Sequence, residues 1–226
     1  MRPGKMDRVR PRGLFVLIVG PDGAGKSTLA DRLADVGRSW PPARQMHWRP
    51  ELLPRLGFYL GSSPGDPTTP HAHAPRPPLV SALTLSYYWL DFFLGSWVRI
   101  RPSVRRGGLV IMERGWFDFA VDPRRYRMRV SPGVVRVLGR LLPRPDLALV
   151  LDASDQTLLA RKTELRGEEL SRQMQMWRAF RFPRGTHKVV IDASRPFEEV
   201  LQTARESVEG LRSASPSSAP QIDSLG

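Results

Sequence analysis

Short apolar runs alternate along this chain with longer stretches at helical spacing, and this alternation predicts an α/β fold. The strand-like runs are Leu14–Val19, 109–112, 147–151 and 189–191, with a weaker candidate at Arg44–His47. The stretches that fit helices are 27–36, 79–100, 132–142, 154–166, 170–180 and 196–211. Pro41, Pro42 and Pro102 are expected to mark boundaries between elements. The pattern is typical of a parallel sheet with helices on both faces.

The first apolar run leads directly into the sequence GPDGAGKST, which fills the phosphate-loop pattern G-x-x-x-x-G-K-[ST]. Glycines let successive N–H groups turn toward phosphate oxygens, and the helix that follows directs its positive end at the same anion. Lys26 is expected to reach the β- and γ-phosphates of ATP, and the Ser27 hydroxyl to ligate Mg²⁺. A chance match in a glycine-rich turn is the alternative, and the strand before the loop and the helix after it argue against it. The predicted nucleotide-binding residues of this loop are Gly20, Asp22, Gly23, Ala24, Gly25, Lys26, Ser27 and Thr28.

Composition narrows the class of protein. The 226 residues are 41% hydrophobic, enough to fill the core of one domain, and they include no cysteine. A disulfide framework, a thiolate metal site and a cysteine nucleophile are therefore excluded, and a cytoplasmic location is expected. The net charge is +13, and most of the basic residues are arginine, which suits phosphoryl ligands but is also explained by a solvated arginine-rich surface. No nucleic-acid-binding motif is visible, so a nucleic-acid partner is not expected.

The domain organisation follows from local composition. Residues 1–12 form a basic N-terminal extension, 13–212 the α/β domain, and 213–226 a polar tail that is expected to be disordered. Residues 49–78 are rich in Pro, Gly and Ser, and are expected to form a flexible, lid-like insertion. The apolar stretch 79–100 is long enough to cross a bilayer, but Asp91 near its middle favours a core helix. Peripheral membrane contact, aided by nearby arginines, is the alternative. A buried Asp91 would need a partner or a place in the substrate site.

The later motifs make the chain resemble the thymidylate kinase branch of the nucleoside monophosphate kinases. They are the loop GPDGAGKST, the pair Glu113-Arg114 at a strand end, LVLDAS followed by Leu-Ala-Arg-Lys, and VIDASRPFEEV. The resemblance runs from residue 14 to about residue 211. It implies a P-loop fold with a five-stranded parallel sheet in the order 2-3-1-4-5. It also implies transfer of the γ-phosphoryl group of ATP, with Mg²⁺, to an acceptor phosphate.

The resemblance also implies roles for individual residues. Asp22 is expected to approach the sugar of the acceptor, and Glu113 to support Mg²⁺ or its waters together with Ser27. Lys26, Arg114 and Arg161 are the expected catalytic residues, because cations stabilise the charge that spreads over the transferred group. Ala193 and Ser194 are expected beside the adenine. A salt-bridged strand end, a solvated helix face and a helix cap are the structural alternatives for these motifs.

The chain departs from the family pattern in the segments expected to bind the acceptor. Thymidylate kinases usually carry a Glu-Pro-Gly-Gly-Thr-like stretch after the second strand, whereas this chain reads HWRPELLP, and Glu replaces Asp before Arg114. We expect a nucleoside monophosphate such as dTMP as the small-molecule partner. A sugar, glycan or other small metabolite, and a nucleotide-dependent regulatory protein, are the alternatives; a homodimer is also left open. The predicted acceptor-binding residues, chosen as basic, acidic or aromatic side chains near the motifs, are Asp22, Arg49, Tyr88, Asp91, Arg114, Asp118 and Arg125.

Overall fold

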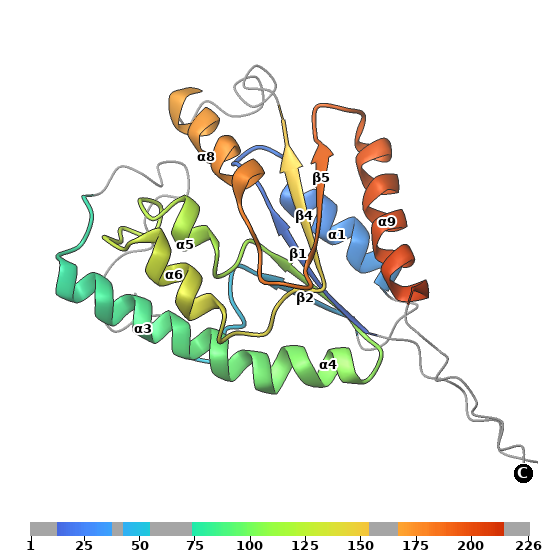
Figure 1. The fold of residues 1–226 in the computed structure, drawn as a ribbon. Helices are drawn as coiled ribbons and strands as arrows, with labels where there is room; N and C mark the ends of the chain where they lie inside the picture. The colour runs from blue at the N-terminus through green and yellow to red at the C-terminus, as the bar shows by residue number, and fades with distance from the viewer. Residues whose placement is uncertain (1–12, 38–42, 55–73, 154–166, 215–226) are drawn as a thin grey trace, which may run out of the picture.

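A five-stranded parallel sheet forms the centre of the molecule (Figure 1). The computed structural model describes residues 13–37, 43–54, 74–153 and 167–214. Within them the strand order is β2-β3-β1-β4-β5, so the predicted order 2-3-1-4-5 is confirmed. All five predicted strands are present, three of them longer than expected at one or both ends. Their bounds are β1 Leu14–Val19, β2 Arg44–His47, β3 Leu109–Glu113, β4 Leu147–Asp152 and β5 His187–Asp192.

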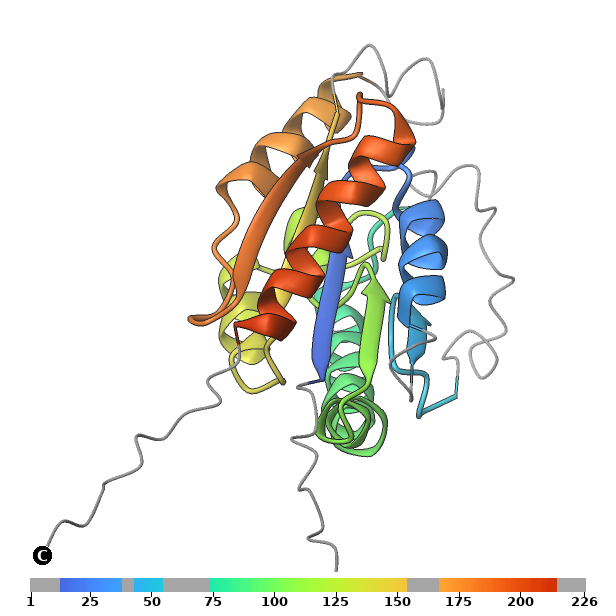
Figure 2. The ribbon, with the colours of Figure 1, turned by 90° about the vertical axis from the view of Figure 1, so that its right-hand side faces the viewer.

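Helices cover both faces of this sheet, as Figure 2 shows from the side. α1 and α9 lie on one face, and α3, α5 and α6 on the other, while α8 contributes to the hydrophobic clusters of both. The bounds are α1 Lys26–Gly37, α3 Pro78–Gly95, the π-helical turn η1 Ser96–Ile100, α4 Arg101–Arg105, α5 Asp118–Val121, α6 Pro132–Gly139, α8 Gly167–Ala179 and α9 Phe197–Ser213. The short helix α5 was not predicted from the sequence.

The continuous apolar character of β1 has a simple cause. Successive strand residues point to opposite faces, so Leu14, Val16 and Ile18 join the cluster under α1 and α9, while Phe15 and Leu17 join the cluster under α3. Because helices bury both faces, every position of the strand must be apolar. This central, doubly covered strand holds the start of the phosphate loop in place.

The helical run after residue 78 does not stop at Pro102 as expected. α3 passes into η1 and then α4, and Pro102 occupies the first turn of α4, where a missing N–H leaves no hydrogen bond unmade. α3 buries one face only, since Leu79 and Leu83 are exposed while Leu85 and Phe92 are buried. No helix in the described ranges is long and apolar enough to cross a membrane. The predicted helix 154–166, most of the insertion 49–78 and both chain ends lie outside the described residues.

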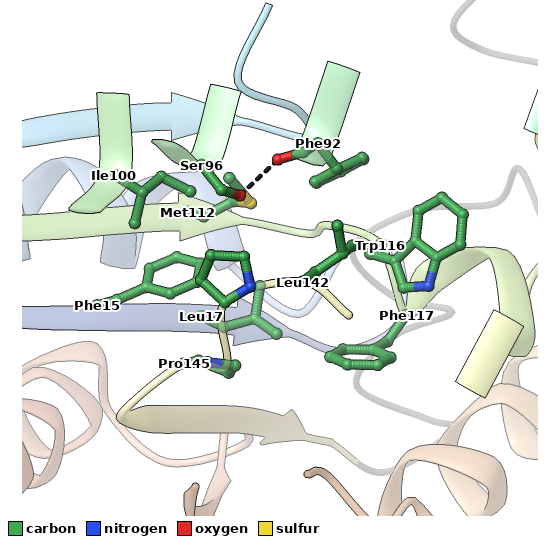
Figure 3. A pocket seen from close by; sticks show the side chains of 11 residues that line it. Phe15, Leu17, Phe92, Ser96, Ile100, Met112, Trp116, Phe117, Leu142 and Pro145 are labelled. Carbon is green, nitrogen blue, oxygen red and sulfur yellow. Dashed lines mark hydrogen bonds between the residues drawn. The ribbon is translucent and has the colours of Figure 1, made fainter. Parts of the chain in front are cut away.

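A small apolar cavity of about 30 Å³ remains where η1 and the end of α3 pack over the sheet. Figure 3 shows Phe15 and Leu17 of β1 on one side of it and Phe92 and Ile100 on the other. Trp116 and Phe117, which follow β3, form one end of the cavity wall. Through the contact between Phe92 and Trp116, α3 packs directly against the segment that follows β3.

Candidate active site

The phosphate loop connects β1 to α1 at the carboxyl edge of the sheet, and three of its glycines adopt positive φ. Gly20, Gly23 and Gly25 have φ of 148°, 82° and 85°. A Cβ on Gly20 would lie 2.5 Å from the carbonyl oxygen of Leu151, so β4 leaves no room for a side chain there. The loop is therefore shaped both by left-handed backbone and by close contact with a neighbouring strand.

Lys26 opens α1 and lies inside this loop. Its side chain is buried, its Nζ donates to the Pro21 carbonyl oxygen at 2.6 Å, and it lies 3.7 Å from Asp22 Oδ1. Burial, followed by the positive charge of Arg114, lowers the pKa of Lys26 to about 7. The carbonyl of Pro21 and the carboxylate of Asp22 hold the ammonium group where the loop surrounds its ligand.

Ser27, Glu113 and His47 form a hydrogen-bonded chain from the helix to two strand ends. Ser27 Oγ donates to Glu113 Oε1 at 2.9 Å, and His47 Nδ1 lies 2.9 Å from Glu113 Oε2. Burial opposes ionisation of Glu113, but hydrogen bonds from His47 and Ser27 outweigh it and lower its pKa. A hydroxyl beside a charged carboxylate is a donor set that fits Mg²⁺, which usually keeps several waters and shares one or two protein ligands with phosphates. Among the described residues no cluster of three His, Asp or Glu side chains offers an all-protein cage.

Asp22 is the centre of the charge network. Its two carboxylate oxygens accept hydrogen bonds from Arg114 Nη2 and Arg125 Nη1, and Lys26 lies beside them. Burial disfavours the Asp22 carboxylate, but the charges of Lys26, Arg114 and Arg125 dominate and hold its pKa far below the usual range. Burial also disfavours the Arg114 cation, yet Asp22 and Asp118 raise its pKa. The network therefore stays ionised and directs three cations at one point.

The backbone around Arg114 is strained. Arg114 has φ of 63° and Gly115 φ of 146°, immediately after β3. The Arg114 N–H still donates to the Ile18 carbonyl oxygen of β1 at 2.8 Å. Non-glycine residues in this region cost roughly 1–2 kcal/mol, and they persist where surrounding contacts determine them. Here the strained turn points the Arg114 side chain back over the phosphate loop toward Asp22.

An aromatic group next to this network contains polar atoms without partners. Trp48 stacks on Tyr126 with ring centroids 5.3 Å apart, and Tyr88 packs edge-on against Trp48 at 5.0 Å. In the described part of the structure, buried Trp48 Nε1, Tyr126 Oη and Asp118 Oδ2 have no hydrogen-bond partner. Burial raises the pKa of Asp118 to about 6 and that of Tyr126 well above its usual value. Unpaired buried polar atoms are costly, and three of them gathered at one place are able to hydrogen-bond the polar groups of a ligand.

Arg49 and Asp91, two predicted acceptor residues, contact each other. Arg49 Nη1 donates to Asp91 Oδ2 at 2.9 Å and to the Leu53 carbonyl oxygen at 3.0 Å, and Asp91 Oδ1 accepts from the Leu53 N–H at 2.6 Å. Both side chains are almost fully buried. The pair joins the segment after β2 to the middle of α3, which supplies the partner that the sequence demanded for Asp91. Arg49 Cζ also lies 5.7 Å from the centroid of the Trp48 ring, so the buried pair contacts the aromatic group.

The remaining predicted residues lie farther out or outside the description. Ala193 and Ser194 follow β5 at the same carboxyl edge, where the Ser194 N–H donates to Asp192 Oδ1. Thr28 is exposed in the first turn of α1. Arg161 lies outside the described residues.

Sequence reasoning missed two members of this site. His47 contacts Glu113 because the parallel register of β2 and β3 places them side by side, and a strand-end histidine opposite the acid was the available signal. Phe119 supports the aromatic group, 4.5 Å from Tyr126 between ring centroids. It was missed because no helix was predicted over α5.

No protein-family model matches the chain. It is similar to a probable thymidylate kinase of Pyrobaculum aerophilum, 30% identical over 206 residues that cover 86% of this chain and 96% of the relative. It is also similar to a probable thymidylate kinase of Archaeoglobus fulgidus, 26% identical over 208 residues, 88% of this chain and 96% of the relative.

Solved structures agree on the fold. Thymidylate kinase from Ehrlichia chaffeensis matches with a TM-score of 0.60 and 16% identity over 88% of this chain and 100% of that one. Thymidylate kinase from Candida albicans matches with the same TM-score and identity over 88% of this chain and 92% of that one.

Proposed function

Because the chain belongs to the thymidylate kinase family, we propose that it is an ATP- and Mg²⁺-dependent kinase that phosphorylates a nucleoside monophosphate such as dTMP. The observation that carries this proposal is the meeting of Lys26, Arg114 and Arg125 at Asp22, beside the Ser27–Glu113 pair. Phosphoryl transfer between two anions needs such a set of fixed cations, because positioning and charge stabilisation supply most of the rate.

The reaction joins an oxygen of the acceptor phosphate to the γ-phosphorus of ATP, while the bond from that phosphorus to the β-bridging oxygen breaks. Lys26 exchanges the Pro21 carbonyl for β- and γ-phosphate oxygens. Arg114 exchanges Asp22 for the transferred group, reaching donor and acceptor from the strained turn after β3. Both cations are already desolvated by burial, so their attraction to the developing charge is stronger than at an exposed site.

Ser27 and Glu113 are the residues that would hold Mg²⁺, which when bound offsets phosphate charge and orients the oxygens of ATP. Glu113 is suited to this role because its hydrogen bonds keep it ionised. His47 fixes the carboxylate from the other side and so sets its orientation toward Ser27.

The acceptor base fits the aromatic group best. Trp48, Tyr88 and Tyr126 offer ring faces and edges, and Asp118 Oδ2, Tyr126 Oη and Trp48 Nε1 offer polar atoms that need partners. Arg125 lies next to Asp22, within reach of a phosphate or sugar between the base and the phosphate loop. Ala193 and Ser194 are assigned to the adenine side of ATP, and Arg161 to the transferred group.

The direct test is transfer of label from γ-labelled ATP to a panel of nucleoside monophosphates, sugars and phosphosugars. We expect labelled dTDP or another nucleoside diphosphate, and a loss of at least about 100-fold in kcat for Lys26→Ala, since one desolvated cation contributes several kcal/mol to such a transition state. Lys188→Ala is the matched control. Lys188 is the other lysine in the described part of the chain, and it contacts only carbonyl oxygens near the end of α8.

Full transfer by a folded Lys26→Ala variant would overturn the assignment of that lysine. Label found only in a sugar or metabolite would show that this compound, and not a nucleoside monophosphate, is the acceptor. Nucleotide binding without transfer to any acceptor would favour a nucleotide-dependent switch.

A further inference from the structure

A second cationic feature lies at the opposite edge of the sheet from the phosphate loop. A cleft of about 1000 Å³ is formed by α4, α6 and the segments that lead into β4 and β5. The loops before β4 and β5 lie at the amino ends of these strands, whereas the phosphate loop follows the carboxyl end of β1 (Figure 1). The volume is at the upper end of the range for small-molecule sites.

Among the described residues, six arginines line this cleft and no acidic side chain does. In the described part of the structure none of the six forms a salt bridge, so their charges are not offset by carboxylates. The nearest acid along the chain, Asp146, accepts a hydrogen bond from the Phe15 N–H instead. The six come from four separate segments and are Arg101, Arg136, Arg140, Arg144, Arg181 and Arg184.

Three of these side chains are oriented by aromatic rings or a backbone carbonyl and not by acids. Arg101 lies 3.9 Å above the Trp97 ring and Arg136 5.6 Å above the Phe180 ring. Arg144 Nη1 donates to the Arg184 carbonyl oxygen at 2.5 Å. Cation–π contacts and a carbonyl hydrogen bond hold the guanidinium groups in place while leaving their charge available. A merely solvated arginine surface has no reason to order its side chains around one concavity.

The cleft has an aromatic floor in Phe117 and Phe182, whose ring centroids are 5.6 Å apart. Pro143 and Pro183 stiffen its walls. Six cations around a stiff cleft of this volume exceed what a single phosphate uses, because one guanidinium binds two phosphate oxygens. The arrangement fits several linked phosphate groups that run across the cleft.

We propose that this cleft is a second anion site that binds an oligophosphate, a ligand with two or more linked phosphate groups. The source is either a phosphate chain alone or a nucleoside polyphosphate whose base covers the aromatic floor. The site does not depend on the kinase proposal, since it shares no residue with the phosphate loop. It is nevertheless connected to that site through Phe117, which directly precedes Asp118.

The test is titration of inorganic tripolyphosphate into the full-length protein in Mg²⁺-free buffer at fixed ionic strength, followed by calorimetry. We expect two sites in the wild type. Lys26→Ala should weaken the one at the phosphate loop, and Arg140→Gln/Arg181→Gln the one in the cleft by at least about tenfold in Kd, because charged hydrogen bonds are lost. Both arginines of this pair are exposed, so we expect the variant to keep its fold. Arg105→Gln/Arg106→Gln, equally exposed but outside the cleft, should change Kd less than about twofold by the same reasoning.

A nucleoside triphosphate titrated into Lys26→Ala distinguishes the two sources. Equal affinity to tripolyphosphate assigns recognition to the phosphate chain, and tighter binding assigns it to a nucleotide. A wild type whose only site is weakened by Lys26→Ala and not by Arg140→Gln/Arg181→Gln, or equal binding by both arginine pairs, would overturn the proposal. So would Arg140- and Arg181-dependent binding of a DNA oligonucleotide or of anionic vesicles without binding of tripolyphosphate. Because calorimetry reads binding alone, a failure of kinase activity would not affect this result.

Discussion

The glycines of the phosphate loop are required for different physical reasons, and single substitutions separate them. Gly25 has positive φ, but a Cβ there meets nothing within 4 Å, so Gly25→Ala should cost about 1–2 kcal/mol of backbone strain. Gly20→Ala should cost about 3 kcal/mol or more, because its Cβ would also overlap the Leu151 carbonyl oxygen. Urea unfolding of the two variants measures the difference. Equal losses would contradict the tight contact between the loop and β4.

Asp118 is expected to reduce stability in exchange for ligand recognition. Its pKa is raised to about 6 by burial, so the folded protein favours the protonated form. Burying the ionised carboxylate lowers the free energy of unfolding. This loss of stability is absent below the unfolded pKa near 4 and is fully present above pH 6. Asp118→Asn should therefore raise the free energy of unfolding at pH 8, by at most about 3 kcal/mol, and change it little at pH 4.

Unfolding by urea at the two pH values measures this effect, with Asp31→Asn as an exposed control. The same Asp118→Asn variant should bind dTMP more weakly. A stability gain that does not depend on pH would contradict the buried, ligand-facing carboxylate.

The residues that a motif specifies were predictable, and those that depend on contacts across the sheet were not. Lys26 and Ser27 follow from loop chemistry alone, because spacing along the chain determines their position. The Arg49–Asp91 contact joins residues 42 positions apart, and no local pattern encodes it. Asp91 could be predicted to need a partner, but sequence alone did not show that Arg49 was that partner.

Among the elements, the junction between the β2 segment and α3 depends on this buried pair. Asp91→Asn leaves the Arg49 guanidinium buried without its counter-charge and should cost about 3–5 kcal/mol. Arg49→Met/Asp91→Leu removes both charges and should cost less than the sum of Arg49→Met and Asp91→Leu made singly. A double-mutant cycle by urea unfolding measures the coupling, and strict additivity would contradict the pair. Retained dTMP phosphorylation in the double variant would assign the pair to structure, and a loss with the fold intact would assign it to acceptor binding.

Strands β1, β3 and β4 were predictable because burial on both faces makes them apolar along almost their whole length, whereas β2, exposed at three of its four positions, gave a weaker signal. Helix ends were less predictable. Pro102 was read as a boundary, yet the π-helical turn before it places it in a new first turn where it is tolerated. α5 is only four residues long and is held by tertiary contacts of Phe119 and Val121, so periodicity could not reveal it.

For the whole molecule, the two edges of the sheet differ in whether their basic side chains are paired with acids. At the carboxyl edge, Lys26, Arg114 and Arg125 converge on the single carboxylate of Asp22. At the amino edge, six arginines surround a cleft that no acid of the described ranges lines. The net charge of +13 predicted anionic ligands in general, but only the fold shows that the cations gather at two separate places.

The central claim is that the phosphate loop and Arg114 transfer a phosphoryl group to a nucleoside monophosphate. Phosphorus NMR of the protein mixed with ATP, Mg²⁺ and dTMP follows donor and acceptor together. The account predicts that dTDP and ADP signals grow at equal rates, and that Lys26→Ala abolishes both. Growth of ADP and inorganic phosphate with unchanged dTMP, or no change at all in the wild type, would contradict it.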